Sequence, residues 1–134
     1  MTALRRTIAA ATDGLIIACG GDGTGPTAGT LKVNLTTPNS GLDGAAIVVL
    51  SAPVAPGSVT AATGLTLWGG PVTAANATIA LTGTLSTGTI LSLQVDDTRQ
   101  VEQYSATLQQ VAISSTPFTL RPPLLTGYSL TVTK

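Results

Sequence analysis

The chain has 134 residues, which suits a single domain, and 9% of them are charged while 43% are hydrophobic. That hydrophobic fraction argues against disorder. The sequence contains no run of about 18 apolar residues, so it predicts no membrane-spanning helix. The net charge is +0 and the few cations are scattered, so we expect no nucleic-acid partner, because that role needs a concentrated basic surface.

The N-terminal residues carry the features of a bacterial export signal. Arg5 and Arg6 form a short basic region, residues 7–18 are mostly apolar, and the sequence Ile16-Ile17-Ala18-Cys19 follows. This arrangement resembles the leader and lipobox of bacterial lipoproteins. The resemblance implies a signal peptide over residues 1–18 and an acylated thiol on Cys19. It implies a chain anchored by lipid in the bacterial cell envelope, at the outer membrane or on its periplasmic or extracellular face.

The lipoprotein interpretation also explains why the chain has a single cysteine, which cannot form an intrachain disulfide. One residue departs from the pattern, since Asp13 places a carboxylate inside the apolar stretch. The alternative is a cytosolic N-terminal helix that ends in a buried cysteine.

A glycine-rich motif, GGDGT at residues 20–24, follows the cysteine. It resembles the phosphate loop of NAD kinases and diacylglycerol kinases, in which a helix N-terminus comes next. Here Gly25 and Pro26 follow, with no helical pattern. We therefore interpret residues 19–29 as the lipidated cysteine and a flexible Gly-rich tether.

From Thr30 onward the hydrophobic pattern has a period of two, which is typical of strands. Residues 30–36 place three apolar side chains on one face. Residues 45–51 form a continuous apolar run, which predicts a central strand covered on both sides. Residues 58–62 and 65–68 are two short strands between Pro- and Gly-containing breaks.

Four further strands are predicted in the second half, over residues 76–82, 89–95, 102–111 and around 128–132. Residues 98–110 could form a helix, but their Thr, Tyr and Val content favours a strand. The total is eight or nine strands spaced about 8–12 residues apart. This spacing predicts an all-β fold: a single antiparallel β-sandwich, jelly-roll or immunoglobulin-like, over residues 30–134.

The order of segments in residues 30–95 also resembles the cohesin-like branch of bacterial β-sandwiches. The segments LKVNL, AAIVVL, SVTAATGLTLW and TIALTGTLSTGTILSLQV carry the resemblance. It implies a jelly-roll-like sandwich with a non-catalytic binding role, as in cohesin modules and related carbohydrate-binding modules. No binding residue of that family transfers to a position of this chain.

The sequence offers little for catalysis. Histidine is absent, SxxK and GxSxG motifs are absent, and Cys19 is assigned to the lipid, so we expect no enzyme and no cofactor. The carboxylates Asp96, Asp97 and Glu102 cluster near one predicted loop. We expect a solvated turn in which an aspartate caps backbone amides. The alternatives are a calcium site and a pair of hydrolytic carboxylates.

Trp68 is the only tryptophan and lies beside Gly69-Gly70. We expect its ring in the core, because tryptophan is usually well buried. The alternative is an exposed ring that stacks on a sugar. Tyr104 and Tyr128 are expected to be core or corner residues.

Three functions remain open at this stage. The leading hypothesis is a non-catalytic envelope lipoprotein with a small interaction or structural module, held to the membrane by its lipid and binding a protein or polysaccharide partner. The alternatives are a carbohydrate-binding module that uses Trp68 and, third, a small carboxylate-dependent hydrolase.

Overall fold

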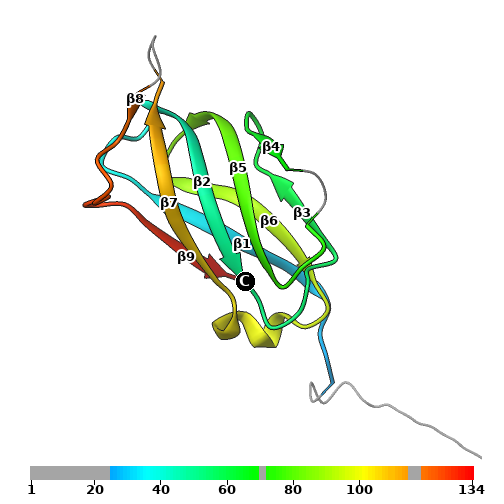
Figure 1. Cartoon of the computed structure of the whole chain (residues 1–134). Coiled ribbons are helices and arrows are strands. Elements are labelled where there is room, and N and C mark those ends of the chain that lie inside the picture. Colours follow the sequence, from blue (N-terminus) through cyan, green and yellow to red (C-terminus); the bar gives the residue numbers. More distant parts are fainter. Residues whose placement is uncertain (1–24, 70–71, 115–118) are drawn as a thin grey trace, which may run out of the picture.

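The computed structural model describes residues 25–69, 72–114 and 119–134, which form two antiparallel sheets packed face to face (Figure 1). The four-stranded sheet has the order β3-β6-β1-β9, and the five-stranded sheet has the order β4-β5-β2-β7-β8. The prediction of a single all-β sandwich is confirmed. The strands are β1 (Gly29–Thr36), β2 (Asp43–Ser51), β3 (Ser58–Ala61), β4 (Thr66–Trp68), β5 (Asn76–Leu85), β6 (Gly88–Val95), β7 (Ser105–Ile113), β8 (Thr119–Leu120) and β9 (Ser129–Thr133).

The core lies between the sheets and follows the predicted alternation. Leu31, Val33 and Leu35 on β1 are buried, as are Leu91 and Leu93 on β6. The five-stranded sheet contributes its inward side chains to the same core: Ala46, Val48, Leu50, Ile79, Leu81 and Val111. Each fully buried side chain of this size contributes about 1.5–3 kcal/mol by leaving water, so this layer accounts for the cohesion of the two sheets.

Strand β2 lies at the centre of the five-stranded sheet, as predicted, but the expectation that it is covered on both sides is wrong for the described chain. Its burial alternates: Val48 and Leu50 point into the core, whereas Ala45, Ile47 and Val49 are only half-buried on the other face. Figure 1 shows no described element lying across that face. The apolar run of β2 therefore leaves an apolar face open to solvent.

The segment before β7 also differs from its prediction. Residues Thr98–Gln103 form a short 3-10 helix, η2, and the strand starts only at Ser105. The Asp97 carboxylate accepts a hydrogen bond from the Arg99 backbone N–H and so caps the first turn of η2. No residue of η2 is buried, which explains why no apolar periodicity in the sequence indicated a helix. No helix among the described residues is long and apolar enough to span a membrane.

Candidate functional site

The structure places Trp68 on the surface, at the end of β4. Its side chain is 54% exposed, so the expectation of a core ring is wrong. The neighbouring Leu67 takes the inward position, where it packs against the core, and adjacent residues of a strand point to opposite faces. The indole Nε1–H donates a hydrogen bond to Thr82 Oγ1 at 2.8 Å, which fixes the orientation of the exposed ring.

Trp68 begins an apolar strip that crosses the outer face of the five-stranded sheet. Strand pairing aligns Trp68 with Ala80, Ala80 with Ile47, and Ile47 with Gln110. The next row runs from Thr82 through Ala45 and Ala112 to Leu120, which is 60% exposed. We call this surface the Trp68 strip; its apolar members are Trp68, Ala80, Ile47, Ala45, Ala112 and Leu120.

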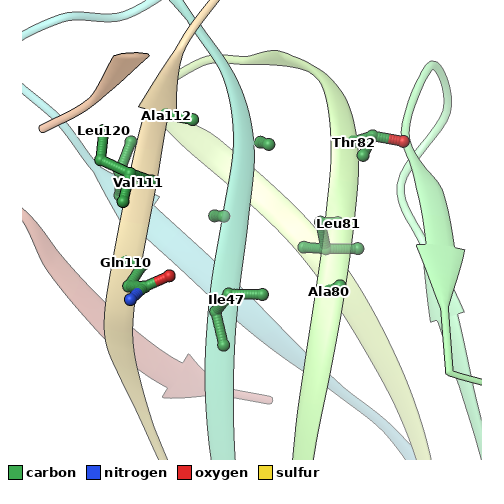
Figure 2. Close-up of a pocket in the computed structure, with 10 residues that line it drawn as sticks. Ile47, Ala80, Leu81, Thr82, Gln110, Val111, Ala112 and Leu120 are labelled. Atoms are coloured by element: carbon green, nitrogen blue, oxygen red, sulfur yellow. The ribbon is translucent and has the colours of Figure 1, made fainter. Parts of the chain in front are cut away.

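The strip contains a shallow hollow of about 170 Å³ (Figure 2). Ile47, Ala80 and Gln110 lie side by side across β2, β5 and β7 in this view, and Leu120 borders the hollow at its β8 end. The hydroxyl of Thr82 points away from β2, consistent with its bond to Trp68 on β4. A second hollow of about 240 Å³ adjoins the first, because both are lined by Gln110 and Leu120, and it extends to Arg121 and Pro122.

The outer face of the four-stranded sheet has the opposite character. Strand β1, one of its two inner strands, presents Lys32, Asn34 and other polar side chains on this face, opposite Thr131 and Thr133 on β9. The Asn34 side-chain amide donates to Thr133 Oγ1 at 2.9 Å. This is the polar surface expected of a solvated antiparallel sheet, and the contrast marks the Trp68 strip as the unusual face of the same molecule.

A buried carboxylate, which the sequence analysis did not identify, links the start of β2 to the segment between β8 and β9. Asp43, the first residue of β2, is 1% exposed and accepts hydrogen bonds from Arg121 Nε at 2.8 Å and from the Tyr128 hydroxyl at 2.6 Å. Arg121 Nη2 lies 2.7 Å from the same carboxylate, and the Asn39 amide donates to the Tyr128 hydroxyl at 2.9 Å. The hydrogen bond with Asp43 raises the pKa of Arg121, because it favours the charged guanidinium.

This buried cluster has a structural role, since the Asp43 carboxylate is closed off from solvent and both of its oxygens have partners. Tyr128 is thus a corner residue, as expected. The only signal in the sequence was the position of Asp43 directly before an apolar strand, which is compatible equally with an exposed turn.

The three acidic candidates do not form a ligand set. Asp97 faces Arg99, whose Nε and Nη2 donate to its two carboxylate oxygens at 3.0 Å each, and it also accepts from the Thr27 backbone N–H at 3.3 Å. The side-chain hydrogen bond from Arg99 lowers the pKa of Asp97 to about 2 and raises that of Arg99. Asp96 and Glu102 are exposed. Within residues 25–69, 72–114 and 119–134, no group of three or more potential metal-ligating side chains occurs.

Tyr104, the residue that follows η2, is buried in the core, as expected. Burial raises its pKa, and the nearby charges of Asp96 and Asp97 act in the same direction. The proposed signal peptide over residues 1–18, Cys19 and the GGDGT motif lie outside the described residues.

Comparison with known proteins assigns no family to the chain, so it is classified by its fold alone. No family model, no curated protein and no solved structure matches it. The fold defines an antiparallel β-sandwich, and the Trp68 strip is an apolar stretch on the outer face of its five-stranded sheet.

Proposed function

We propose that the chain is a non-catalytic binding module whose ligand contacts the Trp68 strip. The observation that carries this proposal is the 54% exposed Trp68, whose indole is hydrogen-bonded to Thr82, a residue that lines the apolar hollow. Tryptophan is the residue most enriched among those that dominate binding energy, and a ring that is already ordered loses little entropy when a ligand covers it. Contiguous apolar surface on a small domain is a further mark of an interaction site.

The carboxylates support a binding role over a catalytic one. Asp43 is buried against Arg121 and Tyr128, and Asp97 is paired with Arg99, so both are engaged in holding the fold. Neither lines either hollow of the outer face. The resemblance of residues 30–95 to cohesin-like sandwiches points in the same direction.

We further propose that the module is a lipoprotein of the bacterial cell envelope, anchored through acylated Cys19. The support is the lipobox sequence and the lone cysteine. Acyl chains contribute about 0.8 kcal/mol per buried CH₂, and an anchor with more than one chain is stable. Radiolabelled palmitate fed to cells is expected to label the native chain and not a C19S variant. Equal labelling of both chains, or of neither, would refute the anchor.

The binding proposal is tested with the full-length C19S chain, which cannot be retained by a lipid on the cysteine. Purified C19S protein is mixed with isolated cell envelopes and sedimented with them. We expect retention of this chain and loss of retention when W68A is added. V54A is the matched control, because Val54 is 53% exposed and lies outside the strip. Equal retention of the W68A and V54A variants would refute the proposal, as would the absence of retention.

A further inference from the structure

We infer that the ligand of the Trp68 strip is an extended, uncharged polysaccharide chain lying across the strands. This inference rests on the proposed binding function and specifies its ligand. It is argued below from the charge of the face, the chemistry of the ring, the polar groups beside it and the shape of the two hollows.

The face selects for a neutral ligand. The outward residues of β4, β5, β2, β7 and β8 are apolar, hydroxyl or amide side chains, and none that strand pairing places there is charged. Arg121, at the far end, has its guanidinium committed to the Asp43 carboxylate. A charged ligand would therefore lose hydration without gaining a counter-charge.

The indole presents an apolar surface and no free donor. Its only N–H already bonds Thr82, so the exposed part of the residue offers carbon surface and no free donor. A pyranose ring has one face made largely of C–H groups, which fits such a surface, while its hydroxyls need partners at the rim. Thr66 and Gln110 lie in the same rows as the strip and supply a hydroxyl and an amide that can both donate and accept.

The site is elongated rather than a pocket for one ring. The two hollows meet at Gln110 and Leu120, and the strip spans all five strands from Trp68 on β4 to Leu120 on β8. Four inter-strand spacings of about 4.8 Å give a track of roughly 19 Å. A linear polymer that crosses the strands would fill such a track.

The same dimensions disfavour a protein as the occupant. Two rows of side chains about 7 Å apart over this length of roughly 19 Å define a strip of roughly 130 Å². A stable protein interface buries about 800 Å² per partner, of which roughly 450 Å² is apolar. An extended peptide lying across the strands would also have backbone N–H and C=O groups with no ladder to pair with. Polysaccharide hydroxyls can instead remain turned to water.

The experiment uses the sedimentation assay with differently treated envelopes and the C19S full-length chain. One portion is digested exhaustively with protease and washed, and another is treated with anhydrous trifluoromethanesulfonic acid, which cleaves glycosidic bonds and leaves peptide bonds. We expect Trp68-dependent retention on protease-treated envelopes and its loss after acid treatment. Retention by the protease-treated material is also expected to be the same at about 0.05 M and about 1 M salt, because screening weakens only charge-mediated binding.

The outcomes separate the two proposals. No Trp68-dependent retention on untreated envelopes overturns the binding function itself. Retention on untreated envelopes that disappears after protease treatment overturns the polysaccharide and identifies a protein partner, and retention that survives both treatments overturns it as well. Loss of retention at high salt overturns the neutral ligand. Trp68→Phe keeps an aromatic ring and is expected to bind more than W68A, which we expect to bind at least about tenfold less than the parent chain.

Discussion

The buried Asp43 cluster gives the most direct test of how this fold is held together. Replacing Asp43 with alanine removes the carboxylate that accepts from Arg121 and Tyr128. It leaves a guanidinium and a hydroxyl, both partly buried, without their acceptor. The fold would then keep its apolar core and lose the connection between the start of β2 and the segment that leads into β9.

The expected loss in free energy of unfolding follows from the burial of Asp43 and from the number of its partners. Removing one member of a buried ion pair costs about 3–5 kcal/mol. The Arg121 side chain retains 19% exposure and can recover some hydration, so we expect the low end, about 3 kcal/mol, for D43A. Tyr128→Phe removes one hydrogen bond to a charged group and is expected to cost about 1.5–2 kcal/mol.

The assay is urea unfolding followed by far-UV circular dichroism. With a slope near 1.5 kcal/mol per molar urea, a loss of about 3 kcal/mol moves the midpoint down by about 2 M. The double variant D43A/Y128F is expected to fall short of the sum of the single effects by about 1 kcal/mol, because the hydroxyl has already lost its acceptor. Strict additivity, or a loss below about 1 kcal/mol in D43A, would refute the coupling. If D43A does not fold, the Y128F variant tests the cluster on its own. An unfolding midpoint of Y128F equal to that of the parent chain would then refute the role of the Asp43 cluster.

Three further predictions concern other parts of the domain. Gly83→Ala is expected to unfold at much lower urea than Gly88→Ala. Both glycines have positive φ, but a Cβ at Gly83 would clash with the backbone oxygen of Gly64, whereas at Gly88 it meets open space. Since the pKa of Asp97 is lowered to about 2 by Arg99, its stabilising effect is present above about pH 4 and lost as the pH falls towards 2. Melting temperatures measured from pH 5 to pH 2 should therefore fall less steeply in D97N; equal slopes would contradict this. W68A should remain folded with a melting temperature close to that of the parent chain, because its ring is largely outside the core, and a loss of more than about 2 kcal/mol in unfolding free energy would show otherwise.

Sequence patterns predicted the strands well, because alternation is a local property of the chain. The inward faces of β1 and β6 follow directly from leucines and valines at every second position. The alternation of apolar and polar residues does not predict which other elements cover the two faces of a strand. The apolar run of β2 was therefore expected to be covered on both sides, whereas the described chain covers one.

The site was harder to predict because its residues meet only through pairing. Trp68 is brought beside Ala80 and Thr82 by register, and Ile47 and Gln110 join them from distant strands. One local signal was available. Leu67 and Trp68 are adjacent apolar residues of one strand, so only one of them can face the core. For Asp43 the partners lie 78 and 85 residues away, and no local pattern identifies them.

The pairing of β1 has a consequence for how the chain acquires its structure. Its neighbours in the sheet are β6 and β9, so Lys32 at the beginning of the domain pairs with Thr133 at its end, 101 residues later. A chain that emerges N-terminus first, from a ribosome or a translocation channel, cannot complete this sheet until its last strand is free. Pairings over such separations fold slowly, on a timescale of about milliseconds to seconds. Until then the edge of β1 that β9 covers stays open to other strands, and protection during this interval would fall to chaperones.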